Sequence, residues 1–114
     1  MDAQELVSRY DAGEREFSTA YLVKSNQSGV ALSEANLSEA NLNGADLSGA
    51  NLKRACLDKA NLNEADLRGA NLEGTFLYGA YLSGANLEGA NLEGAKLYGA
   101  DLSGAIMPNG SIHE

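Results

Sequence analysis

The chain is poor in the residues that build most small protein cores. It has no tryptophan, only 6% aromatic residues, one proline and one cysteine. The single cysteine, Cys56, excludes an intramolecular disulfide framework, and we therefore expect a reducing, cytoplasmic location. The apolar fraction of 44% comes mostly from alanine and leucine, so we expect a narrow and regular core.

Basic residues are also scarce. Eight lysines and arginines face 16 acidic residues, which gives a formal net charge of −8. Because nucleic-acid binding requires a basic surface that neutralises phosphates, we expect no nucleic-acid partner. A partner that is itself basic fits this charge better. No apolar run approaches the length of a membrane span, and the acidic N-terminus lacks the apolar segment of a signal peptide, so we expect no membrane association.

A repeat of five residues fills most of the chain. From Leu32 to Leu102 every fifth residue is leucine, fifteen in succession without an insertion. A small residue, nearly always alanine, stands two positions before each leucine, and asparagine or aspartate usually stands between them. Period five matches neither an α-helix nor a long strand, but it fits a short extended segment followed by a corner. Within the segment, alanine and leucine point to the same side, into the core.

The unit Ala-(Asn/Asp)-Leu-x-Gly resembles the motif of the pentapeptide-repeat family, over roughly residues 15–112. The resemblance implies an all-β fold, a right-handed quadrilateral parallel β-helix of about five coils with 20 residues in each. We expect residues 1–14 to form an N-terminal capping α-helix, residues 15–112 the β-helix, and residues 113–114 a tail. Family members are abundant in cyanobacteria, and the chain resembles their small stand-alone type.

Stacking of 20-residue coils would align the inward residues in four columns. The predicted core residues are Phe17, Leu22, Leu32, Leu37, Leu42, Leu47, Leu52, Leu57, Leu62, Leu67, Leu72, Leu77, Leu82, Leu87, Leu92, Leu97, Leu102 and Met107. The first coil is irregular because Gln27 replaces leucine. Either Gln27 lies inward beneath the capping helix with its amide satisfied, or a local bulge turns it outward.

Stacking would also bring residues 20 apart to strand spacing, where opposite charges attract. Four such pairs occur: Glu34–Arg54, Lys53–Glu73, Glu39–Lys59 and Arg68–Glu88. Glu73 followed by Glu93 is a counterexample. The charge pattern supports coils of 20 residues without proving them.

The two ends of such a solenoid need caps. At the N-terminus, Asp2 and Glu5 have the spacing of a capping box, and residues 2–12 are expected to form a short amphipathic helix. At the C-terminus, Met107 and Ile112 keep the inward register, and no helix follows. We therefore expect a monomer, or a weak dimer through Ile106 and Met107, with a solvent-exposed last coil as the alternative.

No residue constellation points to catalysis, a metal or a cofactor. His113 is the only histidine and has no companion ligand, so a disordered tail is the expected state. Cys56 has no basic neighbour in sequence that would lower its pKa, and we expect a spectator thiol. The acidic residues follow the repeat, and none is set apart as a general acid.

An aromatic cluster departs from the repeat. Phe76, Tyr78, Tyr81 and Tyr98 occupy outward positions that elsewhere hold asparagine, serine or glycine, and Lys96 follows Phe76 by 20 residues. A cation–π contact between Lys96 and Phe76 is expected. The cluster is a candidate interaction patch, because exposed aromatic clusters mark interfaces. The alternative is that these side chains cover one another and the corner backbone.

Three functions remain open from the sequence. The resemblance favours a non-enzymatic interaction or structural module with an unidentified protein partner, in a regulatory or signalling role. The second is a DNA mimic that binds DNA gyrase or topoisomerase, as quinolone-resistance members of the family do; the acidic charge fits, but Lys53, Arg54, Lys59 and Arg68 interrupt it. An enzyme on a β-helix scaffold is the third, which the absence of histidine from the repeat disfavours.

Overall fold

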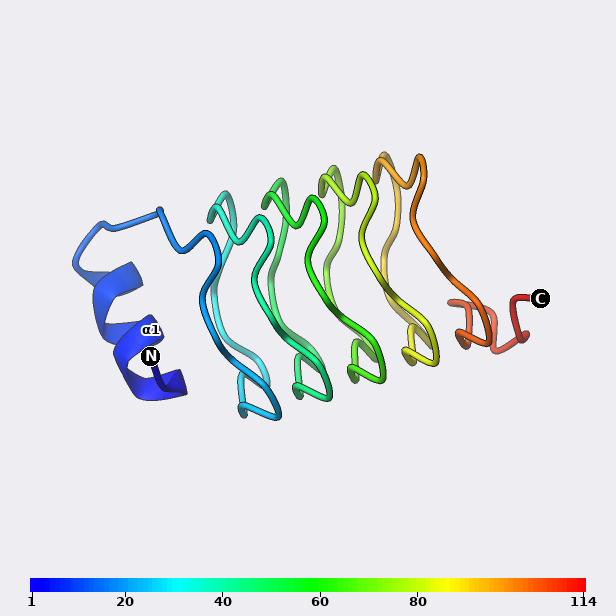
Figure 1. Cartoon of the computed structure of the whole chain (residues 1–114), viewed down its shortest axis with the longest axis horizontal. Helices are drawn as coiled ribbons and strands as arrows, with labels where there is room; N and C mark the ends of the chain where they lie inside the picture. The colour runs from blue at the N-terminus through cyan, green and yellow to red at the C-terminus, as the bar shows by residue number, and fades with distance from the viewer.

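A computed structural model describes residues 1–114 as a short helix followed by a stack of coils (Figure 1). Helix α1 spans Ala3–Asp11, and Asp2 caps it by accepting a hydrogen bond from the Glu5 amide at 2.8 Å. The Glu5 carboxylate lies 3.6 Å from Arg9 instead of returning to Asp2, so only half of the expected capping box forms. Helix α1 is too short to span a membrane, and the fold contains no other helix.

The coils are joined by single-residue parallel bridges between residues 20 apart. The first bridge joins Glu16 to Asn36 and the last parallel one joins Asn86 to Ile106. No strand is longer than one bridged residue, because a corner follows every short extended segment. Each alanine amide donates to the leucine carbonyl three residues earlier, as Ala40 does to Leu37 at 3.0 Å, and this bond closes the corner. Four corners thus make a 20-residue coil, as predicted.

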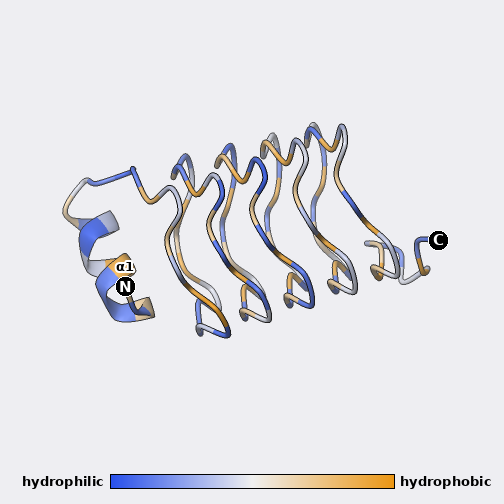
Figure 2. Ribbon diagram, viewed as in Figure 1, coloured by the Kyte–Doolittle hydropathy of each residue, from blue (hydrophilic) through white to orange (hydrophobic).

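The repeat sequence explains the alternation along each side. Inward alanine and leucine side chains are buried, whereas the asparagine or aspartate between them is more exposed. Figure 2 shows the resulting alternation of hydrophobic and hydrophilic residues along the ribbon. Most of these outward side chains accept a hydrogen bond from the amide two residues later, as Asn36 does from Ser38 at 3.0 Å. This bond stabilises the turn that begins there, which is why asparagine and aspartate recur at this position.

The residues at the corners differ between the two halves of the chain. Each corner residue has a φ near +60°, a conformation that only glycine adopts without strain. Up to residue 64, seven corners carry other residues, whereas every corner from Gly69 to Gly104 is glycine. The seven exceptions are Thr19, Lys24, Glu34, Glu39, Arg54, Lys59 and Glu64.

The core is a ladder of buried leucines and alanines inside the coils. From Leu32 to Leu87 every inward leucine is at most 1% exposed. Thr75, which replaces alanine, is satisfied because its hydroxyl donates to the Leu52 carbonyl at 2.8 Å. Gln27 is also fully buried, but neither atom of its amide has a partner. The expectation that an inward Gln27 would be satisfied is therefore wrong.

The ends of the rod differ. Helix α1 lies over the first coil (Figure 1), where Leu6 is fully buried and the Tyr10 hydroxyl donates to the Ser33 carbonyl at 2.8 Å. At the other end, the inward Leu92, Leu97 and Leu102 are only half-buried. These three belonged to the predicted core, but no further coil covers them.

The chain reverses at its C-terminus instead of beginning another side. Ile112 forms an antiparallel bridge with Ile106 and is 60% exposed, so the expected inward register of Ile112 is wrong. Gly110, with φ of +85°, allows the reversal, and the Asn109 side chain accepts from the Ser111 amide at 3.0 Å. The backbone of His113 is held by Gly104 and Ala105, which contradicts the expected disordered tail.

Candidate interaction surface

The aromatic patch, defined as Phe76, Tyr78, Tyr81, Lys96 and Tyr98, covers two adjoining sides of the last coils. Phe76 and Tyr78 lie on one side, with ring centroids 6.5 Å apart and planes tilted by 37°. The Lys96 ammonium lies 5.3 Å from the Phe76 ring centroid, which confirms the predicted cation–π contact. Tyr81 lies on the adjoining side, and its parallel bridge to Asn61 fixes the backbone beneath it.

Tyr98, which follows Tyr78 by one coil, is the most exposed member of the patch. Its side chain is 86% exposed, against 42% for Tyr78. No ring contact joins Tyr98 to another aromatic residue, and Tyr81 has none either. Mutual covering therefore accounts for Phe76 and Tyr78 but not for Tyr81 and Tyr98. Exposed aromatic side chains gathered on one part of a surface are typical of interaction sites.

A bare corner runs through the patch. Gly79 and Gly99 occupy successive coils at the corner between the two sides, with φ of +63° and +75°. A Cβ on Gly99 would meet only the Gly79 backbone, at 3.7 Å. Below them, the aliphatic part of Lys59 leans over Gly79, 3.5 Å from the position of its Cβ. The two glycines therefore leave this corner without side chains of its own.

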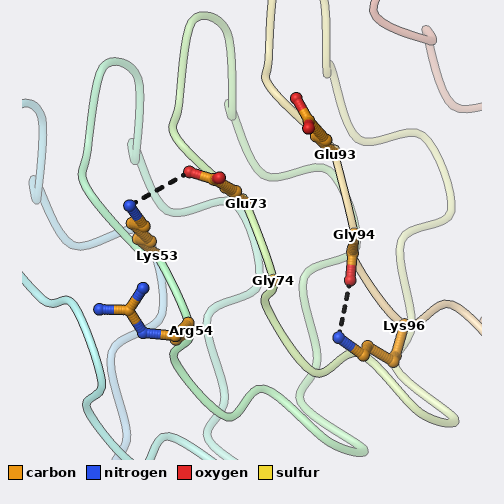
Figure 3. Close-up of a pocket in the computed structure, with 7 residues that line it drawn as sticks. All are labelled: Lys53, Arg54, Glu73, Gly74, Glu93, Gly94 and Lys96. Atoms are coloured by element: carbon orange, nitrogen blue, oxygen red, sulfur yellow. Dashed lines mark hydrogen bonds and ion pairs between the residues drawn. The ribbon is translucent and has the colours of Figure 1, made fainter.

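A charged cleft of about 250 Å³ borders the patch on its other side (Figure 3). Its lining contains no hydrophobic residue: Lys53, Arg54, Glu73, Gly74, Glu93, Gly94 and Lys96. Lys53 pairs with Glu73 at 3.3 Å, while Lys96 donates to the Gly94 carbonyl at 2.9 Å and belongs to both cleft and patch. This cleft was not predicted from the sequence. The sequence feature that could have predicted it is the series Arg54, Gly74 and Gly94, which stand 20 residues apart on successive coils. The two glycines lack side chains and so leave a hollow next to the arginine.

The predicted charge pairs form only in part. Glu34–Arg54 and Lys53–Glu73 are ion pairs at 3.2 and 3.3 Å, as predicted. Arg68 pairs with Asp66 on its own coil at 2.7 Å instead of with Glu88, and this hydrogen bond holds the pKa of Asp66 below its usual value. Glu39 and Lys59 form no ion pair.

Two charged groups of the cleft have hydrogen-bonding atoms available to a partner. Glu93 forms no ion pair, and Arg54 uses its Nε toward Glu34 and leaves its other guanidinium nitrogens free. The cleft can therefore pair with both an acidic and a basic side chain of a bound protein. It supplies polar contacts at the rim of the aromatic patch, which is the usual anatomy of a protein interface.

No cluster of histidine, cysteine, aspartate and glutamate has the geometry of a metal site. Cys56 is half-buried, and burial raises the pKa of its thiol above the usual value, which makes the thiolate scarcer.

Models of pentapeptide repeats match the chain in eight copies, over residues 25–63, 60–97 and 77–109. The chain belongs to the pentapeptide-repeat family. None of the curated proteins compared with it matches.

Solved structures of pentapeptide repeat proteins are similar to the chain. One from the cyanobacterium Nostoc is 38% identical, covers 91% of this chain and 78% of its own, and has a TM-score of 0.61. Another, from the Arabidopsis thaliana thylakoid lumen, is 25% identical, with 91% and 73% covered and a TM-score of 0.66. A third, from the cyanobacterium Cyanothece, is 30% identical, covers 97% of this chain and 99% of its own, and has a TM-score of 0.48. The first two confirm the predicted right-handed β-helix.

Proposed function

We propose that this pentapeptide-repeat protein is a non-enzymatic binding module, and that the aromatic patch is the surface that contacts its protein partner. The observation that carries this proposal is the 86% exposure of Tyr98. Four of the five exposed aromatic side chains belong to the patch, Tyr21 being the other. Tyrosine is enriched at interfaces because a rigid ring buries a large apolar area while its hydroxyl keeps a hydrogen bond.

The rigid scaffold supports this role. The backbone beneath the patch is fixed by inter-coil hydrogen bonds, such as that from the Phe76 amide to the Ala55 carbonyl at 2.9 Å. The rings are therefore presented in a fixed arrangement, and little backbone entropy is lost on binding. The cleft adds charged rim contacts that select among partners.

The partner determines the cellular role, and we propose a regulatory or signalling one in the cytoplasm. A regulator of this kind changes its partner by occupying a surface and needs no reaction chemistry of its own. The free thiol of Cys56 fits a reducing compartment.

The test is a quantitative affinity capture with three forms of the full chain: wild type, a Tyr78→Ser/Tyr98→Ser double variant, and Tyr21→Ser. Tyr21 is a matched control because it is 66% exposed, at an outward position of the first coil, outside the patch. A partner should be enriched by the wild type and by Tyr21→Ser, and lost with the double variant. Thermal unfolding should hardly differ among the three. Retention of the same proteins by the double variant would overturn the proposal.

A further inference from the structure

The charged cleft is a hollow at one corner of successive coils (Figure 3). Its floor is backbone, because Gly74 and Gly94 occupy this corner with φ of +65° and +72°. A Cβ on Gly94 would meet only the Gly74 backbone, at 3.8 Å, whereas a Cβ on Gly74 would meet the Arg54 side chain at 3.2 Å. The lining has no hydrophobic member, so the cleft suits a small and fully polar group.

Basic residues gather in this cleft although the chain is acidic. Lys53, Arg54 and Lys96 are three of only eight basic residues. They share the lining with two carboxylates, those of Glu73 and Glu93. The lining therefore has a net charge of +1, in a chain whose net charge is −8. An acidic side chain of a partner is repelled by most of the surface but attracted here.

Arg54 is the group that can receive such a side chain. Its Nε donates to Glu34 at 3.2 Å, and its two terminal nitrogens have no partner. The Arg54 and Glu34 side chains are 55% and 62% exposed, and an ion pair between exposed side chains is weak. A carboxylate that accepts from both terminal nitrogens of a guanidinium makes a stronger, two-point contact. The existing pair therefore leaves Arg54 able to bind a second carboxylate.

The two lysines of the cleft are already engaged. Lys53 pairs with Glu73 at 3.3 Å, and Lys96 donates to the Gly94 carbonyl at 2.9 Å. Figure 3 shows both of these contacts, with the Arg54 guanidinium next to Lys53 and free of them. The lysines therefore add positive potential around the cleft, whereas Arg54 supplies the free donors.

The unpaired Glu93 is a weaker site for a basic side chain. It lies two coils from Arg54, about 10 Å along the rod, so it repels a carboxylate on the guanidinium only weakly. Lys96 lines the same cleft, and its charge opposes a second cation there. The acidic surface elsewhere also offers a basic side chain many other contacts. The cleft therefore favours an acidic side chain over a basic one.

We propose that the cleft binds a single aspartate or glutamate side chain of the protein partner, with its carboxylate on the two free nitrogens of Arg54. This inference rests on the proposed function: Lys96 belongs to both the cleft and the aromatic patch, so a partner that covers the rings also reaches the cleft. Any other position on the rod would set the acidic residue against an acidic surface. The cleft thus determines where the partner sits on the patch.

An NMR titration of the full chain with N-acetylglutamate α-amide tests the proposal through the backbone amides of Gly74 and Gly94. This probe carries one side-chain carboxylate on a neutral backbone. The amides of N-acetylglutamine and Nα-acetyllysine are its neutral and basic counterparts. Both glycine amides should shift saturably with the glutamate probe, and the other two probes should bind at least about fivefold more weakly.

Two variants test the part played by the arginine. Arg54→Gln should weaken binding of the glutamate probe at least about fivefold, because the two-point contact is lost. Lys24→Gln is the matched control and should bind as the wild type does. Lys24 also occupies a corner, with φ of +56° against +57° for Arg54, and also lies against a glycine of the next coil, Gly44. The amide spectrum of each variant verifies that it is folded.

A further variant tests the sign of the charge effect. Glu93→Gln removes the unpaired carboxylate and should strengthen binding of the glutamate probe by about twofold. The Tyr78→Ser/Tyr98→Ser double variant should bind the probe like the wild type, because the probe contacts only the cleft. The titration therefore separates a failure of the cleft from a failure of the aromatic patch.

Four results would overturn the proposal. The first is the absence of any shift of the Gly74 and Gly94 amides at about 50 mM glutamate probe. The second is binding of the glutamine or lysine probe as tight as that of the glutamate probe. The third is a folded Arg54→Gln variant that binds the glutamate probe as well as the wild type does. The fourth is weaker binding by Glu93→Gln.

Discussion

The two ends of the rod differ in how far their terminal coils are covered. At the N-terminal end, α1 places the buried Leu6 over the first coil, and the inward Phe17 and Leu22 are at most 2% exposed. At the C-terminal end, Leu97 and Leu102 are half-buried and their amides are unpaired. A single coil therefore does not satisfy its own backbone or bury its own leucines. Contacts between neighbouring coils stabilise this fold, so a terminal coil is stable only to the extent that another element covers it.

Removing the cap should have the largest effect. Deletion of residues 1–14 exposes the first coil, and we expect a loss of at least about 3 kcal/mol in the free energy of unfolding, since Leu6 alone is a fully buried leucine. Urea unfolding measures the effect. Deletion of residues 110–114 is the control, and an equal loss of stability from both deletions would contradict the account.

The same substitution should also have different effects in the middle and at the open end. Leu57→Ala removes a fully buried side chain and should lower the free energy of unfolding by about 3 kcal/mol. Leu97→Ala acts on a half-buried leucine at the edge and should lower it by only about 1 kcal/mol. Urea unfolding of both variants measures the difference at low protein concentration. Equal losses would show that the last coil is covered in solution.

The first coil contains a defect that can be repaired. Gln27→Leu restores the leucine column and removes a buried amide without partners. We expect the free energy of unfolding to rise by about 1–2 kcal/mol, because a buried unpaired polar group is destabilising by that order. Gln27→Asn is the matched control, because it keeps the amide and shortens the side chain, and should not stabilise. A fall in the thermal midpoint of Gln27→Leu would mean that ordered water satisfies the amide.

The smallest effects belong to the corners. Gly49 has φ of +66°, and a Cβ added there would meet no atom within 4 Å. Gly49→Ala therefore measures the backbone strain of an alanine at this φ without any steric clash. We expect a loss of about 1 kcal/mol. The reverse change, Glu39→Gly at φ of +58°, should be neutral or stabilising, although glycine makes the unfolded chain more flexible. Thermal unfolding compares the two, and a stabilising Gly49→Ala would contradict the strain argument.

The sequence predicted the coils well because one constraint repeats. Leucine every fifth residue, with alanine two positions earlier, can be buried together only by a chain that turns after each short segment. The cap was predicted for a similar reason, since Asp2 and the apolar face of residues 2–12 are local signals. The aromatic patch was visible because Phe76 and Tyr98 break an otherwise regular outward pattern.

Features that depend on competition between partners were not predictable. Arg68 could reach Glu88 or Asp66, and it pairs with Asp66 on its own coil, two residues away. Ile112 fits the inward register by sequence, but the turn at Asn109 and Gly110 reverses the chain before Ile112 can enter the core. The antiparallel bridge between Ile106 and Ile112 has the same origin. The weak dimer expected through Ile106 and Met107 stays a prediction.

Residue-resolved hydrogen exchange tests the difference between the ends most directly. At low protein concentration, the amides of Leu32, Leu37 and Leu42 should be strongly protected, because each donates to the following coil at 2.7–2.8 Å. The amides of Leu92, Leu97 and Leu102 should exchange freely, because none of them has an acceptor. Strong protection of these three amides in the dilute monomer would contradict the account, because it would mean that the last coil is already covered.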